Sequence, residues 1–505
     1  MEAQGSIPTP VAPERLTGVI SGRSLARAAS WIWSGHIVGQ AAWFSSLIVL
    51  GALLPPKAFG SVAVGMVIAN AAALVQDAGS RGTIVLTRQL RAADISRTVA
   101  INLAVGLGVA AAVGIAAGPI VHHFDAGADV AVLRILVLSV AVRALAIAPM
   151  AVLQRTMKFK AQASVFASSI LIAAVASIMA AAFGAGVWAL VVRQLVAAAL
   201  VPLLAWIVAL RPIRAELAAA PRERGPSRRK GATWFFLLAA TDFVGLSIDS
   251  IVVGHSRGAA QLGLYSLAFT LAFAPLTNFA WQIGKVVFPA AAQTPDLDVI
   301  IRRMLRITRL TAAVLLPLVP PMLVLAPVLL PGILGPEWKA MVVPFQILVV
   351  VGVGHAILVA LGDSLSGIGV IAWRARLHVG WSIGMAAALV VLVHLDGITG
   401  AALAHLLLFV PFAVCYLVWG TKHLQTTGSV MLAALREVAL PVVAQLGLTL
   451  AALVVLRHVL TPSPAAVGAA VIGLAFVACV FVRFTPALVG ECRDFVRAVV
   501  SRAPA

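Results

Sequence analysis

The sequence predicts an all-α polytopic membrane protein with about fourteen transmembrane helices. Three observations predict this fold class: an apolar composition, a regular series of apolar segments, and basic residues confined to alternate connections. Of the 505 residues, 61% are hydrophobic and only 11% are charged, whereas about a quarter of the residues in a soluble domain are charged. So few charges cannot cover a water-facing surface of this size. The excess apolar side chains must therefore face lipid.

The apolar segments have the length that a membrane-spanning helix requires. A bilayer core of about 30 Å takes roughly 20 residues of helix at 1.5 Å each. The first six segments that fit are 30–54, 58–78, 98–119, 130–152, 161–183 and 186–210, and the next six are 232–254, 262–290, 310–333, 340–362, 378–395 and 399–420. Two further segments fit at 436–457 and 464–483. All are apolar without strict alternation, which favours helices over the strands of a membrane barrel.

Basic residues predict the orientation. Most of the 37 Lys and Arg residues fall in the N-terminal segment, in every second connection and in the C-terminal tail. The opposite connections contain only Lys57, Arg257, Lys339 and Arg457. Because basic loops stay in the cytoplasm, we expect an even number of spans, cytoplasmic termini and a bacterial inner-membrane location. Orientation then accounts for the net charge of +19, and we expect no nucleic acid partner.

The longest internal connection predicts the domain organisation, because it divides the chain after six helices. We expect a cytoplasmic segment 1–29, a six-helix lobe 30–210, a basic linker 211–231, a second six-helix lobe 232–420, helices 13 and 14 within 421–484, and a cytoplasmic tail 485–505. The linker combines prolines with basic residues. It is either in contact with anionic lipid headgroups or a plain solvated loop.

Weak internal similarity supports two related lobes. Gly51 and Gly60 stand nine residues apart at the first outer turn, as do Gly254 and Gly263 at the turn after the seventh span. RILV at 134–137 also resembles QILV at 346–349, in helices four and ten. Both repeats start in the cytoplasm. The lobes would therefore be related by an axis along the membrane normal.

Four segments carry a family resemblance: PPKAFG at 55–60, QDAGSRG at 76–82, GLYSLA at 263–268 and LGPEW at 334–338. They resemble the Wzx-type polysaccharide-transport flippases of the multidrug/oligosaccharidyl-lipid/polysaccharide exporter superfamily. The resemblance implies two six-helix bundles around a central cavity that opens alternately to each side. It also implies a cargo of polyprenyl-diphosphate-linked oligosaccharide moved from the cytoplasmic to the outer leaflet. Membrane lipids, H⁺ or Na⁺, and the polysaccharide polymerase machinery would be the other partners.

Charged residues within the apolar segments are functional candidates, because burying charge in hydrocarbon is costly. Arg143, Arg193 and Lys285 could hold the diphosphate, since Arg offers a permanently charged fork that suits phosphate. Lys285 has a second interpretation, snorkelling to the nearby interface. Asp242 and Asp249 are candidates for ion coupling, or for neutralising Arg143 or Arg193 across the lobes.

Polar residues at helical spacing predict the cavity lining. His36 and Gln40 are four residues apart in span one, and Asn278, Gln282 and Lys285 form a stripe in span eight. Asn70 and Asp77 share a face of span two, as Asp242 and Asp249 do in span seven. In the family that the chain resembles, these spans border the cavity. For His36, His355 and His405, a helix-packing role is the other interpretation.

Two other function classes compete with the transport of a lipid-linked sugar. A cation or drug antiporter of the same superfamily would need an acidic cavity, whereas Arg143 and Arg193 favour anionic cargo. A membrane glycosyltransferase or polymer ligase would need a catalytic acid or base on a sizeable outer loop, and the outer loops here are short. The cysteines lack metal-ligand spacing, and no phosphate-binding glycine loop is present. We therefore expect a transporter rather than an enzyme, with no cofactor and no metal.

Overall fold

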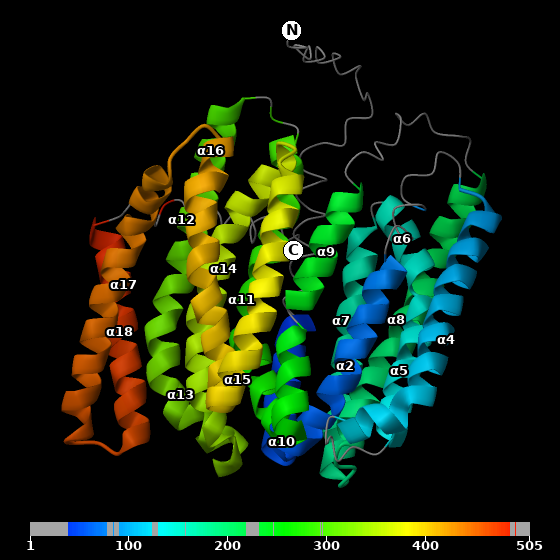
Figure 1. The fold of residues 1–505 in the computed structure, drawn as a ribbon, viewed down its shortest axis with the longest axis horizontal. Coiled ribbons are helices and arrows are strands. Elements are labelled where there is room, and N and C mark those ends of the chain that lie inside the picture. Colours follow the sequence, from blue (N-terminus) through cyan, green and yellow to red (C-terminus); the bar gives the residue numbers. More distant parts are fainter. Residues whose placement is uncertain are drawn as a thin grey trace.

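The computed structural model describes residues 39–77, 84, 90–123, 130–156, 158–218, 232–245, 247–292, 294, 296–484 and 490. Within these residues the regular structure is helical, without a strand (Figure 1). The segment 1–29, most of the linker 211–231, nearly all of the tail 485–505 and His36 lie outside the described residues. The polytopic all-helical fold class is confirmed.

The N-terminal lobe runs from residue 39 to residue 218. Its helices are Gly39–Leu53, α2 (Pro56–Asp77), α4 (Ala92–His123), α5 (Val130–Ala144), α6 (Ile147–Arg155), α7 (Phe159–Ala182) and α8 (Trp188–Ala218). Each of the six spans predicted here overlaps one of these helices, with α5 and α6 together filling the span predicted at 130–152.

The C-terminal lobe follows, and two more helices pack on its outer side (Figure 1). Its elements are α9 (Ala232–Gly245), α10 (Ile248–Ala272), α11 (Ala274–Ala292), α12 (Leu297–Leu315), η1 (Leu316–Leu318), α13 (Val319–Leu334), η2 (Pro336–Met341), α14 (Val342–Gly367), α15 (Ile371–Cys415), η3 (Tyr416–Gly420) and α16 (Thr421–His423). The last two helices, α17 (Gly428–Arg457) and α18 (Pro462–Phe484), lie against α12 and α13.

Two long helices bend sharply where the sequence predicts outer connections. In α10 the bend is at Gly258 (φ 74°), and in α15 it is at Asp396 and Gly397 (φ 56°). Glycine adopts such left-handed angles without a steric penalty. Arg257 joins the two bends, because its guanidinium donates to the carbonyls of Val393 (2.9 Å from Nη2) and His394 (2.6 Å).

The number of spans stays a prediction. The part of the chain that the structure describes contains ten helices long and apolar enough to cross a membrane, and the shorter Gly39–Leu53 in addition. Two of the ten, at Phe243–Ala280 and Ile371–His423, each include one of the bends. The chain is therefore a multi-pass membrane protein.

Prolines break two of the apolar segments, and a neighbouring helix supplies a hydrogen bond at each break. Pro149 has no N–H for the carbonyl of Leu145, four residues earlier, and that carbonyl accepts from Trp206 Nε1 at 3.0 Å. Pro321 likewise has no N–H for the carbonyl of Pro317, four residues earlier. That carbonyl accepts from Gln445 Nε2 at 3.0 Å. The second bond attaches α17 to the C-terminal lobe.

The two lobes repeat a contact at corresponding residues. Arg134, near the start of α5, donates from Nε to the carbonyl of Gly114 in the preceding helix α4, at 3.0 Å. Gln346, near the start of α14, donates from Nε2 to the carbonyl of Leu323 in the preceding helix α13, at 2.7 Å. Arg134 and Gln346 are the first residues of the RILV and QILV segments. The same side-chain contact with the preceding helix in both lobes therefore supports the internal repeat.

The lobes cross where α2 meets α10, and we call this the crossing end. A methyl group on Gly60 would overlap the carbonyl of Ala259, and one on Gly263 would overlap the carbonyl of Pro56. The absence of side chains thus lets the two backbones touch. Beside them, the ring of Phe59 in α2 packs edge-on against the fully buried Trp338 of η2, with ring centroids 5.3 Å apart.

The apolar core differs between the two ends of the molecule. At the crossing end one cluster unites both lobes and includes Leu50, Leu136 and Val191 with Leu262 and Leu348. At the opposite end the described clusters are separate. One contains N-terminal lobe residues of 84–213, and the other contains C-terminal lobe residues of 291–435. The two lobes therefore share one apolar core at the crossing end, and each lobe has its own apolar core at the opposite end.

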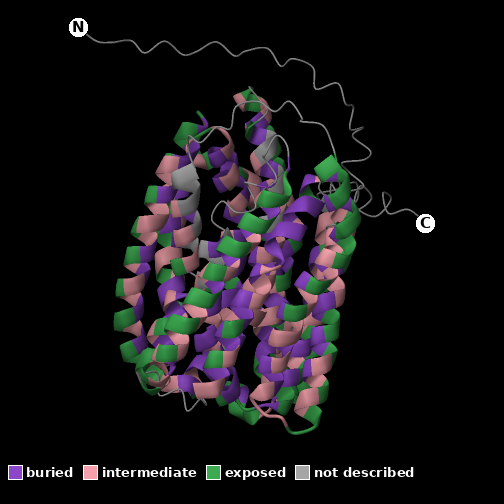
Figure 2. Ribbon diagram, turned by 90° about the vertical axis from the view of Figure 1, so that its right-hand side faces the viewer, coloured by how far each residue is buried: buried purple, intermediate pink, exposed green. Residues whose placement is uncertain are grey.

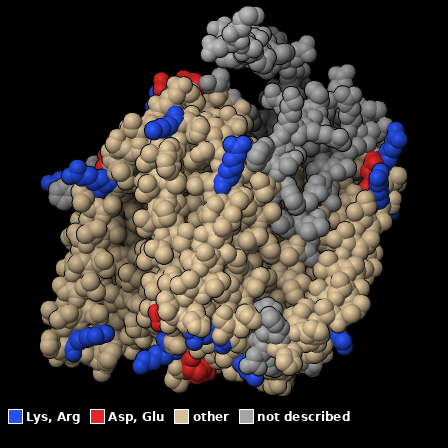
Figure 3. Space-filling model, in the orientation of Figure 1, with Lys and Arg blue, Asp and Glu red and all other residues tan. Residues whose placement is uncertain are grey.

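The surface has the polarity that a bilayer requires. Large apolar side chains such as Ile115, Leu171 and Val443 are more than half exposed, and exposed residues follow the outer faces of the helices (Figure 2). In Figure 3 the charged side chains gather toward the two ends, with a band between them that is nearly free of charge. This band would face lipid.

Candidate functional site

Arg193 is a buried cation in the N-terminal lobe. It lies in α8 and is only 6% exposed. Its guanidinium carbon stands 3.6 Å from the centroid of the Trp43 ring, in the helix Gly39–Leu53, and its Nη2 donates to the carbonyl of Trp43 at 3.3 Å. Among the described residues no carboxylate pairs with it. An aromatic face and one long hydrogen bond therefore hold a charge that has no counter-ion in the described structure.

Arg143 lies in the last turn of α5, just before the break at Leu145, and its side chain is half-buried. Helix α5 packs against α8, which carries Arg193. The structure therefore puts these two predicted cations on adjacent helices of one lobe. Lys285 belongs to α11 in the other lobe.

Asp249 is the centre of a buried polar cluster in the C-terminal lobe. It lies in the first turn of α10 and is 1% exposed. Tyr265, beyond the bend of the same helix, donates its hydroxyl to Oδ2 at 2.8 Å. His405 Nε2, from the second half of α15, lies 3.3 Å from the same oxygen. Asp249 therefore pairs with His405 and Tyr265, and not with Arg143 or Arg193.

The predicted polar stripes are tested only in part. Gln40 and Asn278 are half-buried, and Asn70 is exposed. The helices that carry Asp242, Gln282 and Lys285 are described, but these three side chains lie outside the described part, as His36 does. A polar lumen between the lobes therefore stays a prediction.

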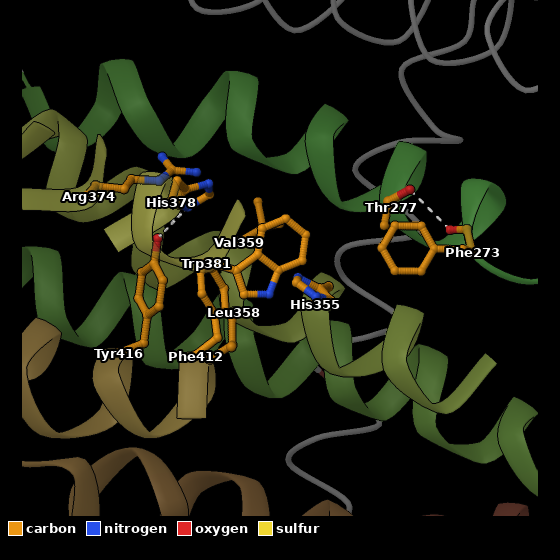
Figure 4. Close-up of a pocket in the computed structure, with 10 residues that line it drawn as sticks. All are labelled: Phe273, Thr277, His355, Leu358, Val359, Arg374, His378, Trp381, Phe412 and Tyr416. Atoms are coloured by element: carbon orange, nitrogen blue, oxygen red, sulfur yellow. Dashed lines mark hydrogen bonds between the residues drawn. The ribbon is translucent and has the colours of Figure 1, made fainter. Parts of the chain in front are cut away.

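A pocket that the sequence did not predict lies inside the C-terminal lobe. It has a volume of about 90 Å³ and is lined by residues of α11, α14, α15 and η3 and by Phe273, which connects α10 with α11 (Figure 4). Its polar lining includes His355, Arg374, His378, Trp381 and Tyr416. Arg374 Nη1 donates to Asp363 Oδ1 at 2.7 Å and to Ser366 Oγ at 2.9 Å, and His378 Nε2 lies 3.2 Å from the Tyr416 hydroxyl. The only sequence signal was the presence of histidines in apolar segments.

Aromatic rings connect the pocket with the Asp249 cluster. The ring centroid of Phe273 is 5.6 Å from that of His355 and 6.1 Å from that of His405. Trp381 stands 6.4 Å from His405 by the same measure. Both Phe273 and Trp381 line the pocket. They therefore form the wall between the pocket and the buried Asp249–His405 pair.

The other buried ion pair is structural. Arg155, at the end of α6, donates from Nε to Glu216 of α8 at 2.6 Å and from Nη1 to the carbonyl of Ile84 at 3.0 Å. Both charged side chains are almost completely buried. This pair ties three segments of the N-terminal lobe together at the end opposite the crossing.

Comparison with known families and sequences gives a consistent picture. Residues 49–343 match the model of a family described as polysaccharide biosynthesis protein. The chain is 22% identical over 329 residues to the succinoglycan biosynthesis transport protein ExoT of Rhizobium meliloti, covering 64% of this chain and 65% of that protein. It is 22% identical to the lipopolysaccharide biosynthesis protein WzxC of Escherichia coli, over 63% and 65%. A shorter match, 28% identical, links 28% of the chain to 29% of the teichuronic acid biosynthesis protein TuaB of Bacillus subtilis. The chain thus spans less than two thirds of the length of each of these relatives.

Solved structures share the fold. The lipid II flippase MurJ in an inward closed conformation superposes with a TM-score of 0.58 at 12% identity, covering 91% of this chain and 97% of that one. A transporter of the MOP superfamily from Pyrococcus furiosus gives 0.53 at 14% identity, over 80% and 98%. At such low identity the likeness establishes the helical architecture alone.

Proposed function

We propose, from the premise that this chain belongs to the polysaccharide biosynthesis protein family, that it is a flippase for a polyprenyl-diphosphate-linked oligosaccharide. The cargo would move from the cytoplasmic to the outer leaflet of the bacterial inner membrane. The names of the relatives support this proposal, since they concern succinoglycan transport, lipopolysaccharide biosynthesis and teichuronic acid biosynthesis. The observation that carries it is the buried cation Arg193 on a two-lobed membrane fold.

The contact pattern between the lobes supports alternating access. One apolar cluster joins the two lobes at the crossing end, and a separate apolar cluster forms the core of each lobe at the other end. Rocking the lobes about the site would break the Gly60 and Gly263 contacts and bring the opposite ends together. In the orientation that the basic loops predict, the crossing end faces outward. The structure would then correspond to a state closed to the outside.

Arg193 is suited to an anionic cargo group. A guanidinium has five N–H donors, and among the described residues the one acceptor of Arg193 is the carbonyl of Trp43. A diphosphate could take the remaining donors and supply the missing counter-charge. We assign Arg143 and Lys285 to the same cationic site, with Gln40, Asn70, Asn278 and Gln282 as the polar lining.

The Asp249 cluster is suited to proton coupling. One of its oxygens, Oδ2, accepts from the Tyr265 hydroxyl and lies beside His405, a side chain that can exchange protons. A hard cation such as Na⁺ would instead need a cage of several oxygen ligands. Proton uptake at Asp249 would weaken its attraction to His405 and loosen the contact between α10 and α15. Asp242 is the second candidate for this role, seven residues earlier.

Transport rather than catalysis fits the described chemistry. The named relatives include transport proteins, and the buried acid and histidine lie within packed helices instead of facing water. A cation antiporter of the same superfamily is the alternative, and Arg193 argues against it because a cationic cargo would be repelled.

The proposal is tested in proteoliposomes. A fluorescent polyprenyl-diphosphate oligosaccharide would be placed in both leaflets, and the fraction accessible to an impermeant quencher followed over time. We expect protein-dependent movement that is absent from protein-free vesicles and not seen with a fluorescent phospholipid. Uptake of a cationic dye without movement of the oligosaccharide lipid would favour the antiporter and overturn the proposal.

A further inference from the structure

Helix α12 carries four arginines at the end of the C-terminal lobe opposite the crossing end. They are Arg302, Arg303, Arg306 and Arg309. The first three are exposed, whereas Arg309 is partly buried and pairs with Glu437 of α17, its Nη1 3.4 Å from a carboxylate oxygen. Arg303 donates from Nη1 to the hydroxyl of Thr294 at 3.2 Å. A guanidinium has five N–H donors, so an exposed arginine with one protein contact can still bind a phosphate.

The exposed arginines lie on the side of α12 that faces away from the protein. Ile300, Met304 and Thr308 are buried and recur every four residues, so they form the face that packs against α14 and α17. At about 100° per residue, Arg302 and Arg306 fall nearly opposite that face. Membrane orientation accounts for positive charge at this end of the molecule, but not for its concentration on one face of one helix.

The length of the helix sets the depth of the arginines in the bilayer. Elements α12, η1 and α13 form one continuous segment of 38 residues, Leu297–Leu334. At 1.5 Å per residue this segment is about 57 Å long, and a hydrocarbon core is only about 30 Å thick. The first turns of α12 must therefore extend beyond the hydrocarbon.

The arginines fall at the level of the lipid headgroups. Arg309, Arg306 and Arg302 precede the apolar segment 310–333 by about 1.5, 6 and 12 Å along the helix axis. The headgroup layer on each side of a bilayer is about 5–8 Å thick. The row of arginines therefore crosses the level of the lipid phosphates.

The residues on either side of the arginines match the two boundaries of the headgroup layer. Toward the bilayer centre, Val314 and Leu318 are apolar and exposed, at 44% and 41%. Toward water, Asp296 accepts from the backbone N–H groups of Asp298 and Val299 and so caps the start of the helix. Acids, then arginines, then exposed apolar side chains follow the order of water, phosphate and acyl chains at a phospholipid surface.

From these features we propose that Arg302, Arg303 and Arg306 form a binding site for an anionic phospholipid, whose acyl chains lie along the exposed apolar side of α12 and η1. The arginine forks suit the phosphodiester, and four arginines against two aspartates leave the segment 296–309 positively charged. A zwitterionic lipid is disfavoured because its ammonium group would be repelled. In the orientation that the basic loops predict, the lipid belongs to the cytoplasmic leaflet. The inference does not rest on the proposed function.

Native mass spectrometry of the purified full-length protein tests the lipid class. The protein in detergent is titrated with phosphatidylglycerol or with phosphatidylcholine of the same acyl chains, and the dissociation constants of the first bound lipid are compared. We expect phosphatidylglycerol to bind at least about tenfold more tightly, because two basic residues beside an anionic headgroup together contribute more than this factor. Equal binding of the two lipids would overturn the site. Displacement of phosphatidylglycerol by an equal concentration of glycerol 3-phosphate would show a site for soluble phosphate and would also overturn it.

Two charge-matched double variants tie the binding to α12. Arg302→Gln/Arg306→Gln removes two exposed charges from the site and keeps residues that favour helix. Lys339→Gln/Arg457→Gln removes two exposed charges from η2 and the end of α17, at the other end of the molecule. We expect the first variant to lose about tenfold in phosphatidylglycerol affinity at an unchanged melting temperature, and the second to bind as the wild type does. Unchanged affinity in Arg302→Gln/Arg306→Gln would contradict the assignment.

Discussion

Gly60 of α2 and Gly263 of α10 pack backbone against backbone where the two lobes cross. The two glycines occupy corresponding positions in the internal repeat, each nine residues after another glycine. Corresponding residues of two repeats meet where an axis relates the repeats, so this contact supports the proposed symmetry. It is also a contact that a transport cycle would have to break and remake.

Alanine at either glycine should destabilise the crossing end. The added methyl group would overlap a carbonyl of the facing helix, and such overpacking costs about 1–3 kcal/mol. We expect a lower melting temperature for Gly60→Ala and Gly263→Ala in detergent. Gly108→Ala is the matched control, since Gly108 lies in a helix with nothing within 4 Å of the new methyl. Equal melting of all three variants and the wild type would contradict the close crossing.

Removing Arg155 should destabilise the N-terminal lobe by about 3–5 kcal/mol, because the buried carboxylate of Glu216 would lose its ion pair. The double variant Arg155→Met/Glu216→Leu should recover most of this loss, since an apolar pair of similar size replaces the ion pair. Thermal unfolding of the purified single and double variants measures both effects. A double variant as unstable as Arg155→Met would show that the ion pair does more than neutralise Glu216.

Asp249→Asn should uncouple translocation from a proton gradient. The amide cannot take up the proton that the carboxylate shares with His405 and Tyr265. In proteoliposomes we expect wild-type translocation to respond to an imposed pH gradient and the variant to translocate at one rate whatever the gradient. Asp298→Asn, at an exposed acid in the first turn of α12, is the control. A preserved gradient response in Asp249→Asn would assign coupling to another residue, with Asp242 the next to replace.

Much of the fold follows from local sequence features. Twenty-residue apolar segments predict the helices, and Gly258 and Gly397 mark the bends because they adopt left-handed backbone angles. The break between α5 and α6 within the segment 130–152 was not predicted, although Pro149 explains it. The sequence could not show that Trp206 takes up the carbonyl freed there, because 61 residues separate the two partners.

The site was less predictable for the same physical reason. Arg193 and Asp249 were found as charges within apolar segments, which is a local signal. The pairing of Asp249 with His405 joins residues 156 positions apart, and helical spacing within one segment carries no information on such a contact. Asp363 and Arg374 fall in the predicted connection between the spans 340–362 and 378–395, where charges are normally solvated. Their partial burial beside a pocket depends on how α11, α14 and α15 pack together.

The initial rate at which quencher-accessible oligosaccharide lipid appears in the opposite leaflet tests the central claim most directly. It would be measured for the wild type, Arg193→Gln and Arg457→Gln, the last altering an exposed arginine at the end of α17. The account predicts wild-type rates for Arg457→Gln and a loss of about tenfold or more for Arg193→Gln, as expected when a charge-assisted hydrogen bond to the cargo is removed. Equal rates in all three proteins would contradict a diphosphate site at Arg193.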